Sequence, residues 1–263
     1  MPYNKSIPLL FFVTLLCVVP NAAWAQKPVP YDNFNHALLD PTKWTLPACS
    51  QANAQEMECV REIQDGQLHL AHRGFGNRDS DAGFQFGSAS LYFINPSSIN
   101  SITTDLTVRS IQEVGCAANP EFGAAAHIDA IFFNTGTGNS NDDVGGHIAM
   151  GRFASDPAGQ LTAYGQISQG NNYFAYFALG TLPVGTPVTM TLTWDQPRHQ
   201  FLAGWTNGIT HVKTQVQMPY TLPDPAPPVN PYKTLTLNTF PSNCSANAAW
   251  VFIDADFDNV FTQ

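Results

Sequence analysis

The sequence predicts an all-β domain, a sandwich or a barrel, from three observations. Almost every apolar segment repeats with period two, so that Ile102, Thr104, Leu106 and Val108, for example, share one face. Glycine and proline number 19 and 20, which predicts frequent turns. Only 12% of the residues are charged, whereas coiled coils and long exposed helices need many charges, and no long window shows a helical stripe.

The expected strands follow one another between turns rich in Gly, Pro, Asn and Asp. In chain order they are Gly66–His72, Ser90–Asn95, Ile102–Val108, Phe122–Asn134, His147–Phe153, Leu161–Ile167, Asn172–Leu179, Val188–Trp194, Arg198–Trp205, His211–Val216, Tyr232–Asn238 and Ala248–Phe261. Two connections are long: residues 134–146 form a polar loop, and the proline-rich segment Met218–Tyr232 is expected to be an extended, stiff cover. Strand signals continue on both sides of each, which predicts a single domain over residues 26–263.

The first 25 residues predict a cleavable secretory signal. An apolar run from Ile7 to Val19 follows Lys5 and ends at Pro20, and it is shorter than the roughly 20 residues that span a bilayer. Small residues stand at the positions that a signal peptidase reads, up to Ala25. We therefore expect a mature chain that begins at Gln26 and is secreted or periplasmic, with no membrane insertion.

Four cysteines follow the expected signal: Cys49, Cys59, Cys116 and Cys244. An even number in an exported chain predicts two disulfides, for which three pairings exist. Cys49 and Cys59 enclose a short polar loop that favours a local bridge, which leaves Cys116 to join Cys244. Each of the latter two precedes a strong strand signal, so we expect them to meet at one end of a sandwich. The net charge of −9 gives no basic surface for phosphate, which excludes nucleic acid as the expected partner.

Three pieces of the sequence resemble the concanavalin A-like lectin/glucanase superfamily, particularly its laminin-G-like members. Near the start they are Tyr31–Phe34, Leu39–Trp44 and Ile63–Leu70, which resemble an opening strand, a tryptophan strand and an "Asp-Gly-x-Leu" strand. The middle piece begins at Val188 and reads as a hairpin, and the last, Ile253–Val260, resembles the closing strand. The resemblance implies a two-sheet antiparallel jelly-roll sandwich whose concave face is available to saccharides.

Carboxylates near the end of the chain are the candidates for catalysis. Asp254, Asp256 and Asp258 alternate and therefore share one face, with neighbouring Cα atoms about 6.6 Å apart. A pair at this spacing suits either of the two glycosidase geometries. The Glu-x-Asp-x-Glu motif of the superfamily's glycosidases is absent, however, which argues against an enzyme.

The resemblance also implies a structural calcium ion as the one expected cofactor. Asp32 in the opening strand and Asp258 in the closing strand match the positions from which members of this fold donate ligands, and hard oxygen ligands suit calcium.

Aromatic residues are the candidates for ligand binding, because sugars stack on aromatic rings. Tyr173, Tyr176 and Trp205 are the selected residues. In the strand that holds the first two, either Phe174 and Tyr176 or Tyr173 and Phe177 should face outward, and the sequence leaves both alternatives open.

We therefore expect an exported module that binds a polysaccharide or a cell-surface glycan through a concave face of aromatic and amide side chains. The first alternative is a polysaccharide hydrolase or lyase that uses carboxylates on the concave face. The second is a structural or adhesion domain that binds protein.

Overall fold

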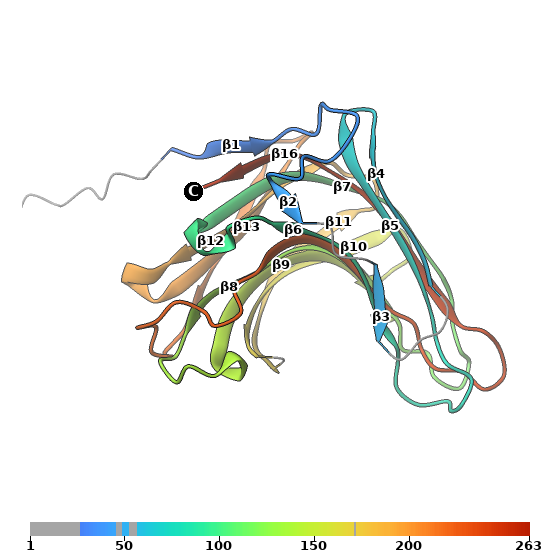
Figure 1. Cartoon of the computed structure of the whole chain (residues 1–263). Helices are drawn as coiled ribbons and strands as arrows, with labels where there is room; N and C mark the ends of the chain where they lie inside the picture. The colour runs from blue at the N-terminus through green and yellow to red at the C-terminus, as the bar shows by residue number, and fades with distance from the viewer. Residues whose placement is uncertain (1–26, 46–48, 53–56, 171) are drawn as a thin grey trace, which may run out of the picture.

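The strands assemble into two antiparallel sheets that stack face to face (Figure 1). A computed structural model describes residues 27–45, 49–52, 57–170 and 172–263. The expected signal, residues 1–25, lies outside the described residues. Period two along the strands is what permits this arrangement, since each strand turns one row of side chains toward the opposite sheet.

The outer sheet contains both end strands of the fold. Its strand order is β14 (Lys213–Pro219), β13 (Gln200–Asn207), β12 (Val188–Asp195), β7 (Ser101–Val114), β16 (Trp250–Thr262), β5 (Gln67–Phe75) and β4 (Met57–Gln64), with β1 (Val29–Asp32) paired to β16. The first and last strands are therefore antiparallel neighbours.

The inner sheet contains the middle of the chain. Its order is β11 (Asn172–Pro183), β10 (Gln160–Gln169), β9 (Asp143–Phe153), β8 (Gly123–Asn134), β15 (Lys233–Phe240), β6 (Phe86–Phe93) and β2 (Trp44–Thr45), with β3 (Ser50–Ala52) paired to β6. The described helices are single 3₁₀ turns, η1 (Pro96–Ser98), η2 (Ser140–Asp142) and η3 (Gln196–Arg198). The prediction of an all-β, two-sheet antiparallel sandwich is confirmed.

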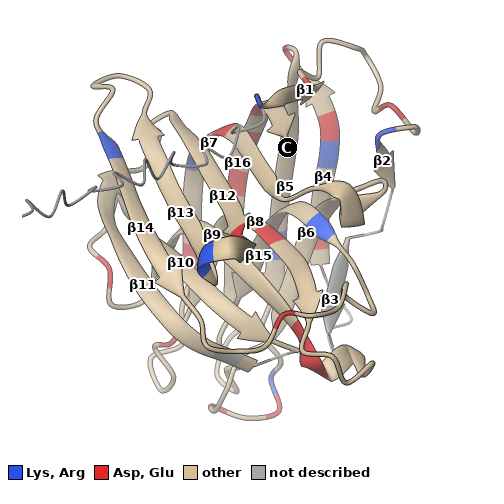
Figure 2. Cartoon of the chain, turned by 90° about the vertical axis from the view of Figure 1, so that its left-hand side faces the viewer, with Lys and Arg blue, Asp and Glu red and all other residues tan. Residues whose placement is uncertain are grey.

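The two sheets bend together into an arch, with the inner sheet on its underside (Figure 1). We call the surface of the inner sheet that is turned away from the outer sheet the concave face. Charged residues are sparse on β10 to β14, whereas bands of acidic and basic residues cross β4 and β16 (Figure 2). Within the outer sheet, charge is thus concentrated toward the β16 and β4 side and is sparse on β12 to β14.

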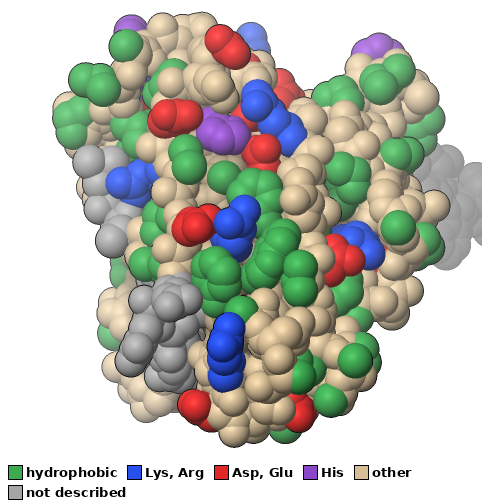
Figure 3. Space-filling model, turned by 90° about the vertical axis from the view of Figure 1, so that its right-hand side faces the viewer, with side chains coloured by type: hydrophobic (Ala, Val, Ile, Leu, Met, Phe, Trp, Pro, Cys, Tyr) green, Lys and Arg blue, Asp and Glu red, His purple; other side chains and the backbone are tan. Residues whose placement is uncertain are grey.

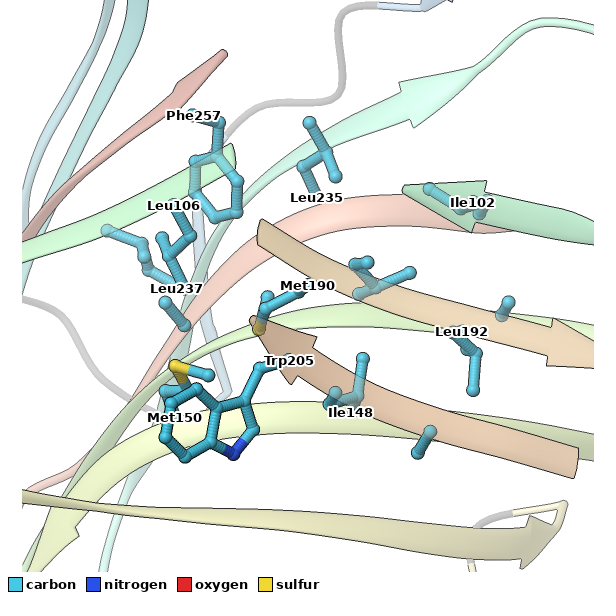
Figure 4. Close-up of a cluster of buried hydrophobic side chains, with 14 of the residues drawn as sticks. Ile102, Leu106, Ile148, Met150, Met190, Leu192, Trp205, Leu235, Leu237 and Phe257 are labelled. Atoms are coloured by element: carbon cyan, nitrogen blue, oxygen red, sulfur yellow. The ribbon is translucent and has the colours of Figure 1, made fainter. Parts of the chain in front are cut away.

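The core fills the space between the sheets with aliphatic and aromatic side chains (Figure 4). On β12, Val188, Met190 and Leu192 are fully buried, while the threonines between them face outward. At about 1.5–3 kcal/mol for each large side chain removed from water, this layer supplies most of the stabilising free energy. Alternation of this kind fixes the register, because a slip by one residue would expose the apolar row.

Both predicted disulfides are present, and each joins the two sheets. Cys59 lies on β4 of the outer sheet and pairs with Cys49, which precedes β3 of the inner sheet. Cys116 follows β7 and pairs with Cys244, which follows β15. The expectation that this second pair meets at one end of a sandwich is confirmed.

The proline-rich segment passes the C-terminal end of β8, where the Asp143 carboxylate and a backbone hydrogen bond hold it. The Val229 and Asn230 backbone N–H groups donate to the two oxygens of Asp143, each at 2.8 Å. The Asn134 N–H donates to the Ala226 carbonyl at 2.9 Å. Strand β4 has no counterpart among the strands that periodicity predicts, because it is an edge strand in which half of the side chains are polar or charged.

Candidate functional site

One row of opposed residues crosses the concave face from β6 to β11. Its members are partners across β6, β15, β8, β9, β10 and β11 in turn. We call this set the concave row, and it consists of Tyr92, Thr234, Asp129, His147, Gln166 and Tyr176. An aromatic residue stands at each end of the row, and polar residues occupy its middle.

Strand alternation places these side chains on the concave face. Ile128 and Ala130, on either side of Asp129, are buried in the core, as is Ile148 beside His147. A Cβ on Gly146 would meet the core ring of Phe201, which shows that this position too faces the outer sheet. The intervening polar residues therefore face the hollow of the arch.

His147 is the centre of a polar cluster on this face. Its Nδ1 lies 2.9 Å from Asp129 Oδ1, and its Nε2 lies 2.9 Å from Ser168 Oγ. His147 and Ser168 are each 3% exposed. Burial raises the pKa of Asp129, but the electrostatic interaction and the hydrogen bond with His147 outweigh this effect, so the net pKa lies below its ordinary value. Asp129 is thus an ionised acceptor for the Nδ1–H of His147.

Next to this cluster lies a second histidine, His127, with an unused ring nitrogen. The residue is 6% exposed, and its Nε2 has no hydrogen-bond partner among the described residues. Burial lowers the pKa of His127 to about 4. A neutral imidazole in this position offers a ligand one more hydrogen bond.

Aromatic rings line the β11 end of the concave face. The rings of Tyr164 and Tyr176 stack with centroids 5.2 Å apart, and Tyr176 is 57% exposed. Phe174 is 48% exposed, whereas Phe177 packs against the core. Of the two alternatives that the sequence leaves open, the structure therefore exposes Phe174 and Tyr176. The side chain of Tyr173 lies outside the described residues.

Trp205, the third selected aromatic residue, lies between the sheets rather than on a surface that a sugar could stack against (Figure 4). It is 8% exposed, and its indole N–H donates to the Leu179 carbonyl at 3.2 Å. The reason is its register on β13, which puts Trp205 on the same side as the core residues Phe201 and Ala203.

The carboxylates of β16 lie on the outer sheet, away from the concave face that the hydrolase alternative requires. Asp256 is 5% exposed and forms a salt bridge with Arg109, and its Oδ1 lies 3.1 Å from His69 Nδ1. Burial raises the pKa of Asp254, although His69 and Arg109 oppose the shift. Figure 3 faces the β4 and β5 side of the arch and shows acidic, basic and histidine side chains among hydrophobic ones. We call Asp254, Asp256, His69 and Arg109 the outer cluster.

The two residues selected for calcium have other partners. Asp32 accepts hydrogen bonds from the Phe34 N–H at 3.0 Å and from the Trp44 indole N–H at 2.7 Å. Burial raises the pKa of Asp258, and the negative charges of Asp105 and Asp32 raise it further. Among the described residues, the one group of three His, Cys, Asp or Glu ligand atoms within 4.8 Å includes the disulfide-bonded Cys116 and Cys244. Calcium therefore stays a prediction, and the donor set around Asp32 fits a hydrogen-bonded carboxylate better.

The sequence reasoning missed Asp129, His147 and Ser168, although a signal for the first two exists. Asp129 and His147 are ionisable residues with apolar neighbours on both sides in the sequence, which is an unfavourable location unless the side chains are paired. Their proximity depends on the pairing of β8 with β9, and that of Ser168 on the pairing of β9 with β10. Neither pairing can be read from the residues alone.

The fold and the site together define an antiparallel two-sheet sandwich with a polar and aromatic row on its concave face. No protein-family model matches the sequence, and no curated protein matches it. Solved structures similar to the chain include the lectin UEA-II in complex with galactose, at 8% identity and a TM-score of 0.41, over 89% of this chain and 98% of that one. A pseudo β-1,3-glucanase of Mycobacterium tuberculosis is similar at 14% identity and a TM-score of 0.45, over 88% of this chain and 97% of that one. Scores and identities this low support no inference about what the chain binds.

No helix in the described part of the chain has the length and apolar character of a membrane span. The two disulfides fit an extracellular protein, because such bridges persist in oxidising compartments.

Proposed function

We propose that the protein binds glycans through its concave face. The observation that supports this most directly is the concave row, in which tyrosines stand at both ends and hydrogen-bonding side chains lie between them. Sugars present apolar faces that stack on rings and hydroxyl groups that need partners, so this combination suits them.

The length of the concave row favours a chain of sugars over a single one. Five strand spacings of about 4.8 Å separate Tyr92 from Tyr176, which gives roughly 24 Å along the sheet. At the β6 end, Tyr92 and Tyr232 have ring centroids 6.1 Å apart. The Tyr232 hydroxyl lies 3.4 Å from both Asp129 oxygens and connects the ring pair to the polar middle.

A glycan array with matched variants tests this proposal. We expect binding to at least one polysaccharide, and a loss of about tenfold or more in affinity for Tyr176→Ala, since one stacked ring contributes on the order of 1–2 kcal/mol. Thr191→Val is the control, because Thr191 lies on β12 of the outer sheet and not on the sheet that carries the concave row. There it lines a hollow of about 220 Å³. Absence of binding on the array, or an equal loss in both variants, would contradict the proposal.

The same proposal includes export and kinship with the concanavalin A-like superfamily. Two bridges between the sheets and the signal-like residues 1–25 support export. The antiparallel sandwich and the terminal strands paired in the outer sheet support the kinship. Detection of a mature chain that begins at Gln26 in the culture medium or periplasm would test the first of these.

A further inference from the structure

We propose that Ser168, His147 and Asp129 form a nucleophile, a base and an orienting carboxylate that hydrolyse a small carboxylic ester. Both required hydrogen bonds are in place at 2.9 Å, from Ser168 Oγ to His147 Nε2 and from His147 Nδ1 to Asp129 Oδ1. A base within reach of a hydroxyl, held in turn by a third group, is the arrangement that activates a serine.

The roles follow from the partners of each atom. Asp129 is ionised and accepts the Nδ1–H of His147, which leaves Nε2 with a free electron pair toward Ser168. With the proton on Nδ1, the Ser168 hydroxyl, whose Oγ lies 2.9 Å from Nε2, is the donor of this hydrogen bond. This tautomer is the one in which His147 can take the hydroxyl proton.

The proposed reaction balances with water as the only co-reactant. Ser168 Oγ bonds to the ester carbonyl carbon while its proton moves to His147 Nε2. The bond from that carbon to the alcohol oxygen breaks, and the alcohol leaves with the proton from Nε2. Water then attacks the acyl-serine and gives a proton to Nε2; the bond between carbon and Oγ breaks, and the proton returns to Ser168. One ester and one water become an acid and an alcohol.

Transition-state charge on the carbonyl oxygen needs a donor. Gln166 lies two residues from Ser168 on the same face of β10 and opposite His147 on β9. Its side-chain amide is the candidate donor within the concave row.

The surroundings of Ser168 restrict the acyl group. Ser168 is 3% exposed, and a Cβ on the neighbouring Gly145 would lie 3.1 Å from Ser168 Oγ. The same Cβ would lie 2.8 Å from Ile131 Cδ1 and 2.8 Å from the Ala130 carbonyl oxygen, so these neighbours leave little room beside the hydroxyl. We therefore assign an acyl group as small as acetyl, and, resting on the proposed glycan binding, an O-acetylated sugar as the natural substrate class.

The test uses the full mature chain with p-nitrophenyl acetate, which does not depend on glycan binding. We expect ester hydrolysis that falls by at least 10²-fold in Ser168→Ala, and a trapped acetyl group on the Ser168 peptide in mass spectrometry. p-Nitrophenyl octanoate should react far more slowly than the acetate. Thr191→Ala, on the outer sheet, should leave the rate unchanged.

Circular dichroism and thermal melting are the controls that check whether each variant is folded. A rate equal to that of the wild type in folded Ser168→Ala, or an acetyl group found only on other residues, would overturn the proposal. Ser168→Ala should still bind the glycans selected by the array. Glycan binding without esterase activity would remove this inference alone, and esterase activity without glycan binding would remove only the proposed function.

Discussion

The concave face and the outer sheet each hold a His–Asp pair, and the two pairs differ in their third partner. In the outer cluster, His69 and Arg109 both contact Asp256, so an imidazole and a guanidinium share one carboxylate. On the concave face, His147 lies between Asp129 and the hydroxyl of Ser168. The first arrangement neutralises charge, whereas the second leaves a base in contact with a potential nucleophile.

This difference teaches that a buried carboxylate beside histidine does not by itself indicate catalysis. The three aspartates on β16 attract attention in the sequence because they alternate, yet Asp256 is held by a salt bridge. Asp129 is a single acidic residue in an apolar strand, and its significance depends on what the fold places beside it.

The largest expected effect comes from replacing Asp129 or Asp256 by asparagine in separate single variants. Asp129→Asn removes the ionised acceptor of His147, so we expect p-nitrophenyl acetate hydrolysis to fall by about 10⁴-fold. Asp256→Asn should leave the rate unchanged but lower the free energy of unfolding by about 2 kcal/mol, because Arg109, although 39% exposed, loses its partner. Rate assays and urea denaturation measure the two effects, and the reverse pattern would make the outer cluster the reactive one.

The two disulfides should contribute different amounts to the free energy of unfolding, because they close loops of different length. Each joins both sheets, so neither belongs to the concave face or to the outer sheet alone. Cys116 and Cys244 are 128 residues apart and Cys49 and Cys59 are 10 apart. On the chain-entropy model, replacing each pair by serine costs about 5 and about 3 kcal/mol respectively. Thermal melting of the two double variants checks the order, and equal losses would show that loop length does not govern these bridges.

Lys233 is a buried basic residue that belongs neither to the polar cluster around His147 nor to the outer cluster. It is 1% exposed, and its Nζ donates to the Ile131 carbonyl at 2.9 Å and lies 4.5 Å from the centroid of the Phe132 ring. Burial lowers the pKa of Lys233 to about 7, from 10.5 in the unfolded chain. The cost of burying Lys233 is largest below pH 7, where the amine is charged in both the folded and the unfolded state, and it disappears as the pH rises toward 10.5.

We therefore expect Lys233→Met to raise the free energy of unfolding by about 2–4 kcal/mol below pH 7, less the lost hydrogen bond, and by little at pH 10. Urea denaturation of the variant and the wild type at several pH values measures this difference. A gain that grows with pH would contradict the sign. Glycan binding should not change, because the Lys233 side chain does not lie on the concave face.

The smallest effect is expected from two buried histidines, one on each sheet. Burial lowers the pKa of His72 and of His127 to about 4, against 6.5 in the unfolded chain. Their contribution to stability is present above pH 6.5 and is lost as the pH falls toward 4. Between pH 6.5 and 5.5, each should cost about 1 kcal/mol. His127→Phe should remove about half of this loss in urea titrations, and a loss that is the same in the variant would contradict the assignment.

Period two is sufficient to predict an all-β sandwich or barrel, and the resemblance in three pieces of the sequence implies the two-sheet sandwich. The short loop between Cys49 and Cys59 is sufficient to predict that bridge and, by elimination, the second one. The burial of individual aromatic residues is harder to predict, because Tyr176 and Trp205 both lie in alternating strands and the sequence does not show which side of its strand faces the core. The site is harder still to predict, since Asp129, His147 and Ser168 become neighbours through strand pairing. Register is a property of the whole sheet, so a local pattern does not contain it.

The central claim is that the concave face is the surface at which this protein acts. Chemical-shift mapping by NMR, with an oligosaccharide cut from the glycan that the array selects, tests it most directly. We predict that the perturbed backbone amides belong to β8, β9, β10 and β11 and centre on Asp129, His147 and Gln166. Perturbations confined to β7, β12 and β16 of the outer sheet would contradict the claim.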